Sequence, residues 1–178
     1  LSSFVSLFLI APTAAAVTYV RGPIASDTIW GIDGVPPDDD TYVVTADVTV
    51  RPGVTLTILP GTTVRFNPAV GLWVDGTLLA AGLPGAQIQF LANGTILPLP
   101  WRAIQFNATA MGSITWSIFD RPDVAVIADG SSPTIGNNTV ELTLDTQSGG
   151  VGVKLGQRKL HAADVVVSIS KTGDSPFA

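Results

Sequence analysis

The chain of 178 residues lacks cysteine and contains a single histidine, His161, and a single glutamate, Glu141. Without cysteine it has no disulfide and no thiolate that acts as a nucleophile or binds zinc or an iron–sulfur cluster. One histidine is too few for a multi-histidine metal centre. These absences exclude a disulfide-stabilised scaffold, thiol catalysis and the common zinc sites.

Charge is also scarce. Only 13% of the residues are charged, whereas about a quarter are charged in a typical soluble domain. The net charge is -5 with nine basic residues, which argues against a nucleic-acid partner because phosphate binding needs clustered Lys and Arg. The apolar content of 46% and a mean hydropathy of +0.43 exclude a disordered chain. We therefore expect part of the surface to be covered by partner subunits, glycans or membrane.

Residues 1–20 form the most apolar segment of the chain. One interpretation is a retained arm that joins neighbouring subunits, and it loosely resembles the apolar arm of pilin-type filament subunits. A second is an uncleaved secretory signal, and a third is an ordinary core segment. All three predict a protein on the export route or at a membrane. The arm's proposed assembly contacts are Leu1, Phe4, Val5, Leu7, Phe8, Leu9 and Ile10.

Short apolar pairs recur along the middle of the chain with a spacing of eight residues. Each pair encloses one outward residue, as in a half-buried strand, and Gly, Pro, Asn or Asp follows most pairs. A strand, a corner and another strand in this rhythm predict a solenoid. The pairs are Val48/Val50, Leu56/Ile58, Val64/Phe66 and Leu72/Val74, continued by Ile88/Phe90 and Ile104/Phe106.

Three such steps predict an all-β, three-sided parallel β-helix of about 24 residues per coil. Residues 24 apart are then expected to stack, which pairs Val48 with Leu72 and Val64 with Ile88. The same period predicts an interior stack of Phe66 and Phe90, with Trp116 as the next aromatic residue. A β-sandwich or jelly roll is the alternative, because it also has short strands and regular turns.

A family resemblance supports the β-helix. The run VTVRPGVTLTILPGTTVRF, followed by GLWVDGTLLAAG and IQF, resembles the first coils of right-handed β-helix proteins of the pectin-lyase-like class. The resemblance implies a secreted or cell-surface repeat protein and says little about activity. It divides the chain into an N-terminal arm (1–20), an acidic connecting loop (21–41), a β-helix (42–140) and C-terminal strands or a cap (141–178).

Few residues in the sequence suggest catalysis. The densest mixed-charge cluster is Asp120-Arg121-Pro122-Asp123, with Arg102 placed one coil earlier. A carboxylate pair beside an arginine suits a polysaccharide-cleaving site, but an ion-paired corner has the same composition. No row of Asp, Lys and Arg recurs on one side of the repeat. We therefore expect no enzymatic activity.

Two further features suggest binding or modification. The acidic residues Asp33, Asp38, Asp39 and Asp40 offer oxygen ligands of the kind that Ca²⁺ prefers, although a solvated acidic loop is the simpler interpretation. Three Asn-X-Thr sequons begin at Asn93, Asn107 and Asn137 and predict N-glycosylation at corners of the solenoid.

Together these patterns predict an extracellular, self-assembling structural protein, a subunit of a filament, sheath or surface layer. Its partners would be copies of itself, joined through the N-terminal arm and the solenoid edges, with glycans and membrane as further contacts. Trp30, Trp73 and Trp101 are the expected aromatic anchors, Trp73 on the outer surface. The alternative is a carbohydrate-binding or polysaccharide-cleaving β-helix domain.

Overall fold

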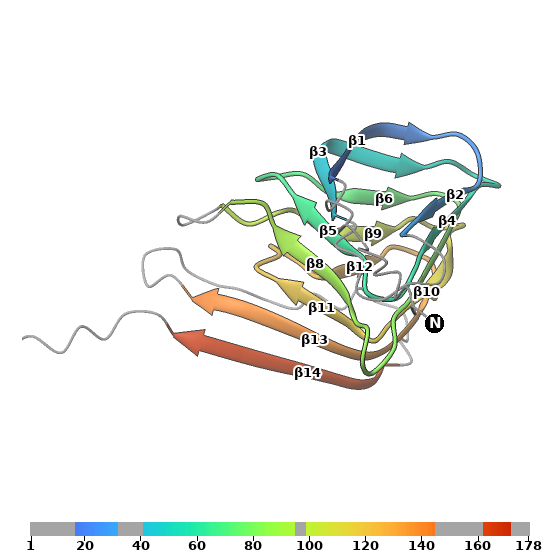
Figure 1. Cartoon of the computed structure of the whole chain (residues 1–178). Helices are drawn as coiled ribbons and strands as arrows, with labels where there is room; N and C mark the ends of the chain where they lie inside the picture. Colours follow the sequence, from blue (N-terminus) through green and yellow to red (C-terminus); the bar gives the residue numbers. More distant parts are fainter. Residues whose placement is uncertain (1–16, 32–40, 95–98, 145–161, 172–178) are drawn as a thin grey trace, which may run out of the picture.

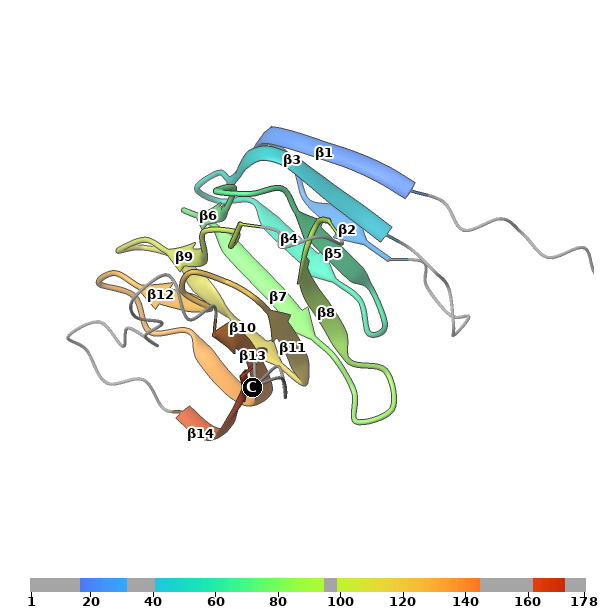
Figure 2. The ribbon, with the colours of Figure 1, turned by 90° about the vertical axis from the view of Figure 1, so that its left-hand side faces the viewer.

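The computed structural model describes residues 17–31, 41–94, 99–144 and 162–171, and all regular structure in these ranges is β. The strands form one 14-stranded sheet that winds from β1 at one end of the molecule to β14 at the other (Figures 1 and 2). They are β1 (Val17–Ile24), β2 (Thr28–Trp30), β3 (Thr41–Val50), β4 (Thr55–Ile58), β5 (Thr63–Phe66), β6 (Leu72–Val74), β7 (Thr77–Ala81), β8 (Ile88–Ala92), β9 (Ile104–Phe106), β10 (Met111–Thr115), β11 (Ser117–Asp120), β12 (Val126–Ala128), β13 (Thr134–Leu144) and β14 (Ala162–Lys171).

The strands stack in three walls. Wall A contains β2, β4, β7, β10 and the start of β13. Wall B contains the first halves of β1 and β3, then β5, β8, β11, the second half of β13, and β14. Wall C contains the second halves of β1 and β3, then β6, β9 and β12. The long strands β1, β3 and β13 each bend from one wall to the next.

All strand pairs are parallel and join residues one coil apart, so the chain is a parallel β-helix of about five coils. This confirms the predicted fold class and excludes the β-sandwich, whose neighbouring strands are antiparallel. Val48 pairs with Leu72, 24 residues later, as predicted.

The period is not strict, and two predicted pairings are wrong. Val64 pairs with Phe90 and not with Ile88, and Arg65 pairs with Leu91. The cause is the corner between β7 and β8, where Leu83 and Ala86 exchange backbone hydrogen bonds of 3.1 and 3.0 Å. This loop adds residues to the coil, so the partners on β5 and β8 are 26 residues apart.

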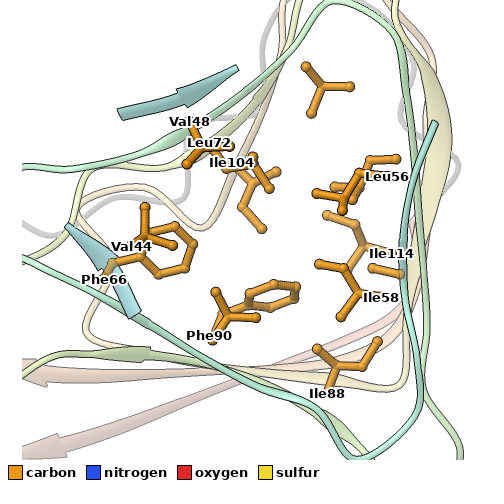
Figure 3. Close-up of a cluster of buried hydrophobic side chains, with 14 of the residues drawn as sticks. Val44, Val48, Leu56, Ile58, Phe66, Leu72, Ile88, Phe90, Ile104 and Ile114 are labelled. Carbon is orange, nitrogen blue, oxygen red and sulfur yellow. The ribbon is translucent and has the colours of Figure 1, made fainter. Parts of the chain in front are cut away.

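The interior is filled by the alternate side chains of all three walls. Figure 3 shows the inward residues of successive coils pointing toward one another, among them Val44, Leu56, Leu72 and Ile114. These four side chains are fully buried. Burial of such a side chain stabilises a protein by about 1.5–3 kcal/mol relative to exposure. The core therefore follows directly from the alternation in the sequence.

Aromatic rings meet inside walls B and C. Phe66 and Phe90 are neighbours with ring centroids 6.5 Å apart, while Phe90 stacks on Phe119 at 5.0 Å. The prediction for Trp116 is wrong, since this half-buried residue lies at the corner before β11 with φ of 50°. The turn directs it away from the core, and Phe119 takes the expected position. Trp101 lies in the same cluster.

The solenoid extends beyond the range predicted for it. β1 and β2 lie within residues 17–30, which the sequence had divided between the arm and the acidic loop. Their turn-rich composition conceals two short strands that pair with β3 and β4. The strand expected at 165–169 is part of β14, which pairs with β13. The proposed strand at 151–155 lies outside the described residues.

Candidate functional site

The most unusual outward residue of the solenoid is Trp73, in the middle of wall C. Its sequence neighbours Leu72 and Val74 are fully buried, and strand alternation therefore directs the indole outward. Thr49 pairs with Trp73 in one neighbouring coil, as predicted, and Gln105 pairs with it in the other. Trp73 is half-buried, so it is less exposed than the sequence suggested.

Arg102 accounts for part of this burial. Its guanidinium carbon lies 5.8 Å from the centroid of the Trp73 ring. A cation–π contact at an exposed site contributes about 0.5–1 kcal/mol. Together the indole and the guanidinium form a flat, partly apolar surface with several hydrogen-bond donors.

A chain of polar side chains borders this surface. Gln105 Nε2 donates to Asn107 Oδ1 at 2.9 Å, and Asn107 Nδ2 donates to Asp75 Oδ1 at 2.5 Å. Asp75 and Asn107 each follow a wall C strand, which places them at the same corner of successive coils. They are 32 residues apart because the loop between β8 and β9 lengthens this coil. A fixed period of 24 therefore could not reveal the pair.

The charged cluster around Asp120 is a different arrangement. Arg121 Nη2 lies 2.9 Å from Asp120 Oδ2, and Arg121 Nε donates to both oxygens of the same carboxylate. Backbone bonds from Asp123 to Trp101 and from Val124 to Arg102 confirm that Arg102 lies one coil earlier. Its guanidinium, however, contacts Trp73, and the Asp120 carboxylate is ion-paired with its own neighbour.

The other two predicted aromatic anchors are buried. Trp30 is 3% exposed and stacks on Tyr42 with 5.1 Å between ring centroids. Trp101 is fully buried, and its Nε1 donates to the Asp120 carbonyl at 2.9 Å. Their role as contact anchors was wrong, because tryptophan in a narrow solenoid supplies the volume that fills the interior.

The three sequon asparagines have different surroundings. Asn93 Nδ2 donates to Asn67 Oδ1 at 2.8 Å, and Asn107 Nδ2 donates to Asp75. Asn137 is exposed, with φ of 55° at the corner between the two halves of β13. The nitrogen that carries an N-linked glycan is thus part of the corner hydrogen bonds at Asn93 and Asn107. Asn137 is the most open of the three.

Sequence reasoning missed Asn138, the neighbour of Asn137. Asn138 is 2% exposed and bridges two coils inside the corner between walls A and B. Its Oδ1 accepts from the Ser117 amide and its Nδ2 donates to the Ile114 carbonyl, both at 2.8 Å. The repeated asparagine had indicated only a turn. No short-range signal distinguishes an Asn that points inward from one that points outward.

Several predicted residues lie outside the described part of the chain. These include the candidate Ca²⁺ ligands and the apolar arm, so both remain predictions. Within the described ranges, no group of three or more His, Cys, Asp or Glu residues is placed to hold a metal ion. In the same ranges no helix has the length and hydropathy of a membrane span. The residues outside these ranges are Asp33, Asp38, Asp39, Asp40, Leu1, Phe4, Val5, Leu7, Phe8, Leu9 and Ile10.

Comparison with known proteins gives one local similarity. No family model matches the chain, and no solved structure gives a significant match. A segment of 77 residues is 49% identical to part of Protein bark beetle from Drosophila melanogaster. That segment covers 40% of this chain and 2% of the relative. The chain therefore spans only a very small part of a much longer protein.

Proposed function

We propose that this β-helix is a non-enzymatic, extracellular structural protein that assembles with copies of itself through the open edges of its end coils. The support comes from the ends of the solenoid. Among the described residues, no strand pairs with the outer edge of β1 or with that of β12. Unpaired backbone groups of parallel strands are a template for further strands, and strand addition satisfies them.

The side chains of β1 favour such an association. Val17 is 50% exposed and Tyr19 is 72% exposed, and both alternate on the same face of the strand. Lysine on an edge strand normally prevents edge-to-edge pairing, and β1 has none. The end coil therefore combines a free edge with exposed apolar side chains. A second copy that adds its own end coil would bury both.

The experiment compares the full chain with an edge variant. Val17→Lys with Tyr19→Lys places two charges on β1, and Gln89→Lys is the control because β8 is paired on both sides. Size measurement and negative-stain microscopy are expected to show assemblies for the parent and the control, and monomers for the edge variant. Monomers of the parent chain at high concentration would contradict the proposal.

The N-terminal arm is a separate connector in this proposal. Deleting residues 1–16 leaves β1 and all later strands in place. If the arm joins subunits, the deletion reduces the size of the assemblies, whereas unchanged assemblies would show that the edges suffice. Comparison of this deletion with the β1 variant distinguishes the two modes of contact.

The second candidate function is carbohydrate binding at Trp73. The observation that favours it is the outward indole beside Arg102 and Gln105, because sugar rings stack on aromatic faces while polar groups bind their hydroxyls. Trp73→Ala should then abolish retention on a polysaccharide column. Cleavage of polyuronides that is lost in Asp120→Ala or Asp123→Ala would favour a cleaving domain instead.

A further inference from the structure

Wall A has an outer face that neither proposed function uses. The strands β2, β4, β7, β10 and residues 134–136 contain no charged residue. Wall B, in contrast, carries Arg65 and Asp120 on its strands. On wall C the guanidinium of Arg102 covers Trp73, and Asp75 and Asp129 directly follow two of the strands. Wall A is thus the least charged face of an acidic chain.

Wall A also exposes large apolar side chains. Ile29 is 63% exposed, Leu79 is 40% exposed and Met111 is 66% exposed. Ile29 and Leu79 belong to one column of paired outward residues that crosses five coils. Leu79 is the middle residue of that column, with Thr57 on one side and Ser113 on the other. The column therefore has a large central side chain between two smaller ones.

We propose that wall A is a lateral interface through which two copies of this chain pack face to face. The occupant is inferred from charge. With a net charge of -5, two copies repel one another across any face that carries acidic groups. Wall A brings no charges together, and an apolar face gains most from another apolar face. A two-fold axis near Leu79 places each copy's leucine against the smaller side chains of the other.

The size of the face sets the strength of the pairing. Five coils at about 4.8 Å spacing and strands of about five residues give a face of roughly 19 by 16 Å. This area is well below the roughly 800 Å² per partner of a standard interface, which predicts a weak dimer. In a polymer the face is repeated on every subunit, so many weak contacts act together. Wall A would then bundle polymers that the end coils build.

The pairing does not depend on edge association, and the two are separable by size. Loss of lateral pairing alone leaves single polymers, whereas loss of edge association alone leaves dimers. The β1 variant Val17→Lys with Tyr19→Lys is therefore a suitable background for the test. In it we expect a concentration-dependent monomer–dimer equilibrium that is insensitive to salt, because wall A has no charges to screen.

The first test is Leu79→Asp, with Leu91→Asp as its matched control. Leu91 is a half-buried outward leucine on wall B and pairs with Arg65, which tolerates an added carboxylate. Sedimentation equilibrium of the full chain should show dimerisation weakened about tenfold or more by Leu79→Asp, because it brings two like charges together. Leu91→Asp should have no effect. A parent chain that stays monomeric, or equal weakening by both substitutions, would overturn the proposal.

A second test uses the absence of cysteine. Leu79→Cys and Leu91→Cys each introduce the only thiol of the chain at an outward position. Mild oxidation should produce disulfide-linked dimers of Leu79→Cys much faster than of Leu91→Cys. Equal rates would show random collision and would contradict the lateral interface. Circular dichroism of both variants verifies that the β-helix is intact.

Discussion

The indole of Trp101 lies nearly flat on the ring of Phe66, with ring centroids 4.4 Å apart and an angle of 12° between the planes. The loop after β8 brings Trp101 to this position, and the next residue above Phe66 in the wall is the small Ala92. The tryptophan fills the space that the alanine leaves. An irregular insertion thus completes the core instead of interrupting it.

Trp101→Ala should therefore destabilise the fold by about 3–5 kcal/mol, because it removes a fully buried ring and leaves a cavity. It also removes the hydrogen bond from Nε1 to the Asp120 carbonyl. Denaturant titration measures the loss. Trp73→Ala is the control and should cost less than about 1 kcal/mol, since Trp73 packs on the outer face. Equal losses would contradict the placement of Trp101 in the core.

Asn138→Ala should destabilise the β-helix by about 2–3 kcal/mol. The substitution leaves the Ser117 amide and the Ile114 carbonyl without their side-chain partner in a buried corner. Thermal unfolding measures the effect, and Asn137→Ala, one residue earlier and exposed, serves as control. A neutral Asn138→Ala would show that the coils are not joined in this way.

Gly112→Ala should be strongly destabilising, by more than about 2 kcal/mol. Gly112 has φ of 144°, and a Cβ at this position would meet the backbone of Leu78 at contacts of 2.0 to 2.9 Å. Backbone atoms of a paired strand cannot move away without breaking the ladder. Gly85→Ala is the control, because nothing lies within 4 Å of the point that its Cβ would occupy. The two unfolding midpoints should differ clearly.

The sequons provide another prediction. On expression through a glycosylating secretory pathway, Asn137→Gln should remove most of the glycan mass without a change in stability. Asn107→Gln should lower stability instead, because Asn107 Nδ2 donates to Asp75 across two coils. Intact-mass measurement and thermal unfolding of each variant decide the matter. A glycan found mainly on Asn107 would contradict the assignment of its side chain to the corner.

The sequence predicted the class of fold and much of the core because alternation with Gly and Pro corners repeats in it directly. It predicted the pairing of Val48 with Leu72 but not that of Val64 with Phe90, since the loop at residues 82–87 changes the period. Trp101 and Asn138 were missed for the same physical reason. Both act across coils, and their partners depend on loop lengths that local patterns do not reveal.

The candidate sites were less predictable than the fold. Trp73 was correctly placed between Thr49 and the next coil, because both belong to regular strands. Its contact with Arg102 was not foreseen, since Arg102 lies in a loop and its side chain has several neighbours of opposite and aromatic character. Long, flexible side chains at corners choose partners that only the three-dimensional arrangement determines.

The most direct test of the central claim is the size of the purified full chain over a wide range of concentration. Sedimentation velocity with negative-stain microscopy should show assemblies that grow with concentration in the parent and are lost when β1 carries Val17→Lys and Tyr19→Lys. Gln89→Lys should assemble like the parent. A single monomeric species at every concentration, with or without the β1 substitutions, would contradict assembly as the function of this β-helix.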